Sequence, residues 1–173
     1  LPIVAELQRN LIISHAVCVG NPLPLDLVRA MLAIRINTLL RGHSGVRVVT
    51  LERLCDLLRL DLIPVVPEKG SVGASGDLAP LSHLALAVIG EGEVFEQGQR
   101  VPAAEALARA GLEPLTLSFK EGLALNNGTG QMLASAILAV GRLEHLAKLA
   151  DINAALALEA FCGRSAAFDA RVH

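Results

Sequence analysis

A mainly α-helical fold is predicted by the composition of this 173-residue sequence and by the spacing of its apolar residues. Hydrophobic residues make up 53% of the chain, while aromatic residues make up only 2%. Alanine and leucine, both strong helix formers, dominate the apolar set, and apolar positions recur at helical spacing in several separate stretches. We therefore expect a helical bundle with a long central helix and one small β-hairpin.

Three amphipathic helices are predicted before residue 60, at residues 3–18, 24–41 and 45–59. Gly20-Asn21-Pro22 stops the first helix, because proline cannot continue a helical hydrogen-bond ladder. Arg41-Gly42 closes the second, since glycine is the usual residue just after a helix end.

Within these helices the pattern also predicts which side chains face the core. In the third helix, Leu54 and Cys55 are expected to face inward, and Thr50 and Arg53 to face water. In the second helix, we expect Arg35 to be solvated or paired rather than catalytic.

Breakers and periodicity also predict the elements after residue 60. Pro64 and Pro67 favour an extended segment, because the residue before a proline avoids the α region. Asp77 is a favourable N-cap for the apolar run that follows it. The elements predicted from there on are a helix at 77–90, hairpin strands at 93–96 and 99–101, a short helix at 102–110, a long helix at 129–162 and a loop-like tail at 163–173. The long helix carries few charges, so we expect it to be buried on most sides, as in the centre of a bundle.

Composition argues against several classes of function. The net charge is −2 with both signs mixed along the chain, so no basic surface for nucleic acid is predicted. No apolar stretch approaches the roughly 20 residues that span a bilayer, and no signal-peptide pattern is present, so we expect a cytoplasmic protein without a membrane partner. The three cysteines are far apart and are expected to be reduced core residues, with no disulfide frame and no metal site. A mean hydropathy of +0.52 predicts burial inside a larger assembly.

The stretch from Gly70 to Asp77 carries the most specific chemistry. Its three glycines lie within seven residues, which indicates a tight and unusual turn. If the fold compresses Ala74-Ser75-Gly76, the Gly76 nitrogen can attack the Ala74 carbonyl carbon, and the Ser75 hydroxyl can leave as water. The product is a five-membered ring with an exocyclic methylidene, a strong electrophile made from the chain itself.

Two other kinds of functional loop do not match this stretch. A nucleophile elbow requires Gly-x-Ser-x-Gly, and Asp77 stands at the final position. A phosphate-binding loop would end in Gly-Lys-Ser/Thr, and Asp77 would place negative charge where the phosphate sits. An ordinary glycine-rich turn capped by Asp77 is the alternative that spacing alone leaves open.

The longer string Gly-Ser-Val-Gly-Ala-Ser-Gly-Asp-Leu-Ala-Pro-Leu-Ser-His at residues 70–83 resembles the signature of the aromatic amino acid ammonia-lyases. The resemblance implies that Ala74-Ser75-Gly76 becomes 4-methylidene-imidazole-5-one, the self-made prosthetic group of that family, with no external cofactor. It also implies that Asp77 assists ring formation.

Two further strings resemble the same family, in the same order along the chain. Leu-Gln-Arg-Asn-Leu-Ile-Ile-Ser-His ends in Ser14-His15, the pair expected to face the substrate side chain and typical of the histidine-acting members. Phenylalanine-type members usually carry Phe-Leu there, and tyrosine-type members His-Leu. Asn127-Gly128-Thr129 resembles the family's Asn-Gly-Thr, whose amide donates to the oxygen where negative charge develops. Asn126 stands where an aliphatic residue is usual, so an exchange of roles between Asn126 and Asn127 stays open.

The resemblance implies that residues 1–173 are a single fragment from the N-terminal half and central bundle of a larger all-α ammonia-lyase catalytic domain. The implied reaction is the non-oxidative deamination of L-histidine to trans-urocanate and ammonia, in a homotetramer with shared active sites. The family's catalytic Tyr and its carboxylate-binding Arg are expected outside this chain, so the 173 residues alone should be inactive. The alternatives are a tyrosine or phenylalanine ammonia-lyase or aminomutase, and a non-catalytic helical scaffold in which Ser75 stays a serine.

Overall fold

The computed structural model describes residues 2–73 and 75–173 and divides into two compact units, Leu1–Ser135 and Ala136–His173. Helices dominate both units, as the apolar periodicity predicts, and the strands are short. The residues of the predicted site that the structure describes all belong to the first unit.

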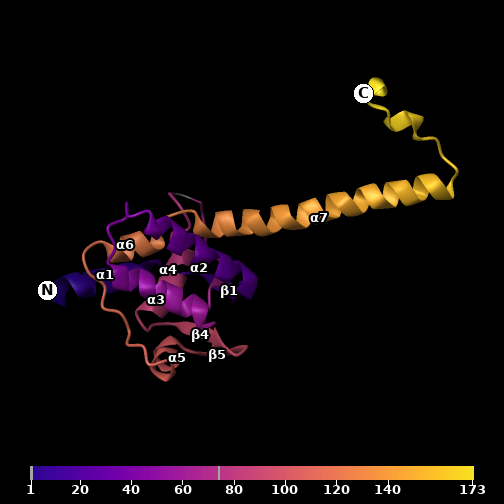
Figure 1. Ribbon diagram of the computed structural model, residues 1–173. Helices are drawn as coiled ribbons and strands as arrows, with labels where there is room; N and C mark the ends of the chain where they lie inside the picture. Colours follow the sequence, from indigo (N-terminus) through magenta and orange to yellow (C-terminus); the bar gives the residue numbers. More distant parts are fainter. Residues whose placement is uncertain (1, 74) are drawn as a thin grey trace. The chain divides into compact units, whose positions relative to one another are not determined.

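Helix α4 (Leu78–Val88) lies at the centre of the first unit (Figure 1), and most of its side chains are buried. It packs against α1 (Pro2–His15), α6 (Glu121–Asn126) and α3 (Val48–Arg59), and α3 packs against α2 (Leu25–Leu40). The largest fully buried apolar side chains of this core are those of Ile12, Met31, Leu32, Leu39, Leu54, Leu57, Ile63, Leu81, Leu84, Leu107 and Leu125. The loop that precedes α4 is therefore attached to a helix that lies largely within the core.

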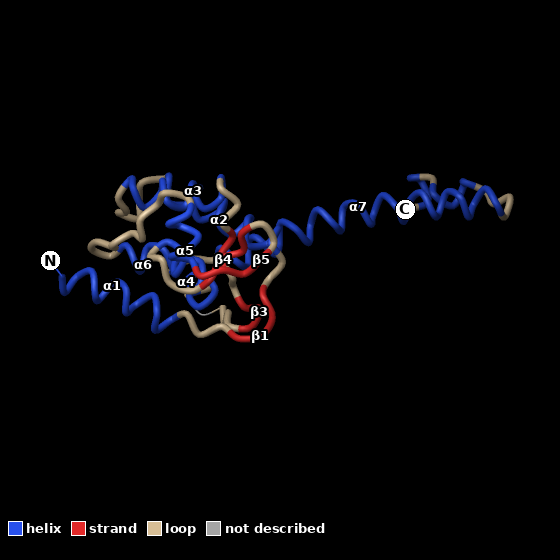
Figure 2. Tube along the Cα trace, turned by 90° about the horizontal axis from the view of Figure 1, so that it is seen from below, coloured by secondary structure: helices blue, strands red, loops and turns tan. Residues whose placement is uncertain are grey.

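Two small antiparallel sheets complete the first unit (Figure 2). Strand β1 (Val19–Pro22) pairs with β3 (Pro67–Lys69), so the segment that follows α1 lies beside the segment that leads into the glycine-rich loop. The second sheet has the order β2 (Ile63–Pro64), β4 (Glu93–Glu96), β5 (Gln99–Pro102). The predicted hairpin is confirmed as β4 and β5, and both residues of its turn have positive φ, as a type I′ turn requires.

The short helix predicted after the hairpin is confirmed as α5 (Ala103–Arg109), and the long helix as α7 (Gly130–Ala160). The second unit holds most of α7 and two 3₁₀ helices, Ser165–Phe168 and Ala170–Val172, in the tail that was expected to be loop-like. The large apolar side chains along this part of α7 that are exposed are those of Ile137, Val140, Leu143, Leu146, Leu149, Ile152 and Leu156. Contacts within the described chain do not bury this helix on most sides, so its predicted place at the centre of a bundle remains a prediction for a larger assembly.

Several predicted orientations are wrong, and the segment before α6 explains two of them. Thr50 and Arg53 are buried rather than solvated, because residues 113–121 cover that face of α3 and supply polar partners. Cys55 and Cys162 are exposed, and only Cys18 of the three cysteines is buried. Leu115, Leu117 and Phe119 of the covering segment alternate with polar residues, but residues 113–118 form neither helix nor strand, so no helix or strand pattern placed them over α3.

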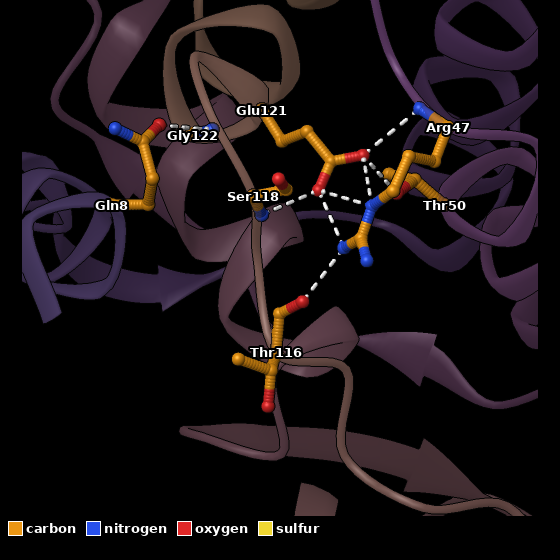
Figure 3. A network of polar contacts seen from close by, with 7 residues as sticks. All are labelled: Gln8, Arg47, Thr50, Thr116, Ser118, Glu121 and Gly122. Atoms are coloured by element: carbon orange, nitrogen blue, oxygen red, sulfur yellow. Dashed lines mark hydrogen bonds and ion pairs between the residues drawn. The ribbon is translucent and has the colours of Figure 1, made fainter. Parts of the chain in front are cut away.

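Glu121, at the start of α6, is a buried carboxylate at the centre of a polar network (Figure 3). It accepts hydrogen bonds from the Thr50 hydroxyl at 2.7 Å, the Ser118 amide at 2.7 Å and the Arg47 amide at 2.9 Å. The Arg47 guanidinium donates to the same carboxylate at 2.7 Å and to the Thr116 carbonyl oxygen at 2.7 Å. One carboxylate thus joins α6 to α3 and to the segment between α5 and α6.

Burial alone would raise the pKa of Glu121, but the hydrogen bonds from Arg47, Ser118 and Thr50 outweigh it and hold the pKa at about 2, below the ordinary 4.5. The neighbouring Gly122 amide donates to Gln8 Oε1 at 2.9 Å, which ties α6 to α1 as well. Helix α6 has only six residues, so its position is fixed by these side-chain hydrogen bonds rather than by the backbone hydrogen bonds within the helix.

We predict that Glu121→Gln in the full-length protein lowers the free energy of unfolding at neutral pH by about 3 kcal/mol, because a buried charged partner of Arg47 is lost. A folded-state pKa below the ordinary value stabilises fully above pH 4.5, and this contribution is lost as the pH falls towards about 2. The wild type should therefore approach the variant's stability across that acid range, as measured by denaturant unfolding at several pH values.

The control is Glu52→Gln, which removes the charge of an exposed carboxylate on α3. Its stability should stay within about 0.5 kcal/mol of the wild type. A Glu121→Gln variant as stable as this control at neutral pH would show that the network does not stabilise the fold.

Candidate functional site

The backbone of the glycine-rich loop is strained where the sequence predicts ring closure. Ser75 has φ 63° and Gly76 has φ 125°, and an added Cβ at Gly76 would lie 2.5 Å from the Gly128 carbonyl oxygen. Only glycine fits that space, and a non-glycine residue at positive φ is costly to hold. Ala74, the first member of the predicted ring, lies outside the described residues. The two described members have the unusual backbone that the sequence predicts.

Asp77 is fully buried and holds this loop from two sides. Its Oδ1 accepts a hydrogen bond from the Ser71 hydroxyl at 2.7 Å, and its Oδ2 accepts one from the Met132 amide at 2.9 Å. Its own amide donates to the Gly128 carbonyl oxygen at 2.6 Å. Asp77 does occupy the N-cap position of α4, but its side chain makes no cap bond, because the carboxylate is engaged by Ser71 and Met132. The predicted capping role is therefore wrong, and the carboxylate instead ties the loop to the start of α7.

The two adjacent asparagines have different environments. Asn126 is fully buried at the end of α6, and its Nδ2 donates to the Ser82 hydroxyl at 3.1 Å. Asn127 follows the helix and is exposed. Only Asn127 can present its side-chain amide to a molecule outside the core, which supports Asn127 over Asn126 as the functional residue.

His15 is the last residue of α1 and is half-buried. Its Nδ1 lies 2.8 Å from the Leu11 carbonyl oxygen, and because a carbonyl can only accept, Nδ1 carries the proton. The Ser14 hydroxyl donates to the same carbonyl at 2.9 Å and lies 3.1 Å from His15 Nδ1. In the neutral ring the Nε2 lone pair is therefore available to accept a hydrogen bond from a ligand.

A cavity of about 310 Å³ brings the two predicted stretches together. Ser14 and His15 from α1 line one part of it, and Gly70, Gly76 and Leu78 from the loop and the start of α4 line another. Asp77 and Asn127 are not among the described residues that line this cavity: Asp77 holds the loop through Ser71, and Asn127 precedes Gly128, whose carbonyl oxygen accepts the Asp77 amide. The lining is mostly apolar, which suits the side chain of a small aromatic molecule.

His83 of α4 binds the segment that follows α1, next to the cavity residue Val17. Its Nε2 accepts a hydrogen bond from the Cys18 amide at 3.1 Å, and burial lowers the pKa of His83, so it is a neutral acceptor. An added Cβ at Gly70 would lie 2.2 Å from the Cys18 sulfur. The segment after His15 is therefore pressed against both the loop and α4.

Sequence reasoning missed Arg35. It was expected to be solvated or paired, yet it is 4% exposed, and Nη1 donates to the carbonyl oxygens of Asn127 at 3.0 Å and Ala124 at 3.3 Å. Burial lowers the pKa of Arg35, and the charge of Asp77 opposes that shift. A signal was present, because Arg35 falls three residues after Leu32 and so lies within the apolar stripe of α2.

No metal site is formed by the residues the structure describes, since none of their His, Cys, Asp and Glu side chains gather in a group of three or more. In the same part of the chain, no helix is both long enough and apolar enough to cross a membrane.

The sequence profile of aromatic amino acid lyases matches residues 3–173. The chain is 56% identical over 168 residues to the histidine ammonia-lyase of Myxococcus xanthus, covering 97% of this chain and 33% of that protein. It is 55% identical over 170 residues to the histidine ammonia-lyase of Geobacillus sp. strain WCH70, covering 98% of this chain and 34% of that protein. This chain thus spans about a third of the length of these relatives.

Solved structures also resemble this chain. The histidine ammonia-lyase of Trypanosoma cruzi superposes with a TM-score of 0.91 at 41% identity, over 98% of this chain and 34% of that one. The tyrosine aminomutase of Streptomyces globisporus superposes with a TM-score of 0.90 at 48% identity, over 98% of this chain and 32% of that one.

We predict that Gly76→Ala destabilises the full-length protein by about 3 kcal/mol, because the new methyl group would overlap the Gly128 carbonyl. The control is Gly73→Ala, which also has positive φ but has open space around an added Cβ, and which should cost about 1 kcal/mol. Both substitutions are made together with Ser75→Ala, so that ring closure does not contribute. Equal losses in denaturant unfolding would contradict the close approach of the two backbones.

Proposed function

Because this chain belongs to the aromatic amino acid lyase family, we propose that it forms part of a histidine ammonia-lyase, which converts L-histidine to trans-urocanate and ammonia. The single observation that carries the proposal is the cavity that His15 shares with Gly76, where an imidazole-binding group faces a ring-forming loop. We further propose that residues 1–173 are one region from the N-terminal half of a larger catalytic domain.

The described residues fit the proposed ring. Gly76 is held in a cradle that a Cβ would fill, and the exposed Ser75 lies at a strained φ beside it. In ring closure the Gly76 nitrogen bonds to the Ala74 carbonyl carbon, and one water leaves with that carbonyl oxygen and the amide hydrogens of Ser75 and Gly76. A second water leaves with the Ser75 hydroxyl and its Cα hydrogen. Strain already present in the loop lowers the cost of reaching the closed geometry.

The 4-methylidene-imidazole-5-one formed in this way supplies a strong electrophile for the substrate. Asp77 fixes the start of α4 and the loop through Ser71 and Met132, so the tripeptide is held rigidly while it closes. The exposed amide of Asn127 is the group that we assign to donate a hydrogen bond where negative charge develops.

His15 and Ser14 are assigned to the substrate side chain. The Nδ1 hydrogen of His15 is taken up by Leu11, so Nε2 can accept the N–H of an imidazole substrate. The Ser14 hydroxyl donates to the same Leu11 carbonyl oxygen and lies against the His15 ring, which restricts the orientation of that ring. A hydrogen bond of this kind recognises histidine and has no counterpart on phenylalanine.

The second candidate is a tyrosine or phenylalanine ammonia-lyase or aminomutase with the same electrophile. The 48% identity to a tyrosine aminomutase favours it, while Ser14-His15 favours histidine. The third is a non-catalytic scaffold, which requires Ser75 to stay unmodified.

The exposed apolar side chains along α7 support the proposal of a homotetramer with shared active sites, because so many exposed apolar side chains on one helix favour burial against a partner. A cytoplasmic location is proposed from the composition.

We predict that the peptide spanning residues 70–83 of the natively folded, full-length protein is lighter than its sequence requires by two water molecules. The Ser75→Ala variant should not show this loss, because it lacks the hydroxyl that leaves, and it should release no ammonia from L-histidine. High-resolution mass spectrometry of the isolated peptide makes the measurement. An unmodified wild-type peptide would contradict the lyase proposal and favour the scaffold.

We predict that His15→Leu in the full-length protein raises KM for L-histidine about 10- to 100-fold, because one hydrogen bond to the substrate is lost. The control is His43→Leu, which changes an exposed histidine outside the cavity and should leave KM unchanged. Steady-state ammonia release gives both values. An unchanged KM in His15→Leu, or a preference of the wild type for tyrosine or phenylalanine, would favour the second candidate.

A further inference from the structure

We propose that Arg35 is a positioning residue of the reaction centre: its guanidinium holds the Asn127–Gly128 turn against the backbone of Gly76 and Asp77. This inference rests on the proposed function and assigns a role to a side chain that touches neither the substrate nor the reacting atoms.

One side of the turn is held by Arg35. Nη1 donates to the Asn127 carbonyl oxygen at 3.0 Å, and an added Cβ at Gly128 would lie 2.6 Å from Nη2. The guanidinium also bonds the Ala124 carbonyl oxygen at 3.3 Å, so it satisfies two carbonyls at the end of α6 that the helix leaves free. A cation at this end is also favoured by the helix dipole.

The other side of the turn contacts the ring-forming loop. The Gly128 carbonyl oxygen accepts the Asp77 amide at 2.6 Å and blocks the space where a Gly76 side chain would lie. Gly128 is therefore enclosed between the Arg35 guanidinium and the Gly76–Asp77 backbone. Moving Arg35 would move the carbonyl that compresses the loop.

Arg35 is not explained by a salt bridge. Its described hydrogen bonds go to backbone carbonyls, and its Nε has no partner among the described residues. A buried cation without a bonded carboxylate is expensive. The buried Asp77 carboxylate interacts with Arg35 electrostatically across the turn, which partly compensates that cost. The arrangement places a fixed positive charge beneath the turn that carries Asn127.

The test uses the full-length protein with Arg35→Gln, which removes the charge and most donors, and Arg35→Lys, which keeps the charge but replaces the planar guanidinium beside Gly128 with a single ammonium group. The control is Arg29→Gln, on the same helix, where the arginine pairs with Asp61 at the surface. The first readout is the modified fraction, which is the share of the 70–83 peptide that has lost two waters. The others are kcat and KM for L-histidine. Dividing kcat by the modified fraction gives kcat per modified subunit.

In Arg35→Gln we expect the modified fraction to fall at least about tenfold, and kcat per modified subunit to fall about 100-fold, because a small displacement of positioned groups has an effect of that size. In Arg35→Lys we expect a partial loss of both. KM should stay within about twofold in both variants, because Arg35 does not touch the substrate. Arg29→Gln should match the wild type in every readout.

Two results would overturn the inference alone. The first is folded Arg35→Gln protein with wild-type modification and kcat. The second is loss of the folded state in both Arg35 variants, judged by circular dichroism, which would assign Arg35 to folding. An unmodified peptide in the wild type would instead overturn the proposed function, and the inference with it.

Discussion

Two stretches of backbone meet without any side chain between them at the Gly128 carbonyl. That oxygen accepts the Asp77 amide at 2.6 Å and lies where a Gly76 Cβ would be. Such an approach requires glycine on the loop, and the same requirement falls on Gly128, whose other side faces the Arg35 guanidinium. The Asn127–Gly128 turn compresses the loop before α4 only while Arg35 holds the turn in place. The strain at Ser75 and Gly76 therefore depends on groups outside the tripeptide.

The surrounding polar network explains how that strain is sustained. Asp77 ties the loop to Ser71 and Met132, and Glu121 fixes the start of α6, the helix whose last carbonyls Arg35 holds. Asp77, Glu121 and Arg35 are buried and hydrogen-bonded, and a hydrogen bond in a buried, low-dielectric site is costly to break. The strained loop is thus one face of a rigid scaffold rather than an isolated turn, as preorganised sites require.

Much of the fold could be predicted from the spacing of apolar residues and from the glycines and prolines that end helices. Long helices and a two-residue hairpin turn leave clear local patterns of this kind. The loop proposed to form the ring, and Ser14-His15, could also be identified from local strings, and residues of both line one cavity. What the sequence did not reveal was decided by non-local contacts. Helix α6 is too short to show a period, Thr50 and Arg53 are covered by an irregular segment, and Asp77 bonds residues on two other elements instead of capping its own helix. Arg35 was missed for a different reason: its charge suggested a solvated side chain, although its position in the apolar stripe of α2 indicated burial.

The most direct measurement is a high-resolution crystal structure of the full-length protein, with attention to the density from residue 74 to residue 77 and at residue 128. Compression of the loop by the held turn predicts continuous ring density joining the Gly76 nitrogen to the Ala74 carbonyl carbon. It also predicts the Gly128 carbonyl oxygen on the Asp77 amide and the Arg35 guanidinium beneath Gly128. An open chain at Ala74-Ser75-Gly76 in well-ordered density, with those contacts intact, would contradict the view that they drive ring closure.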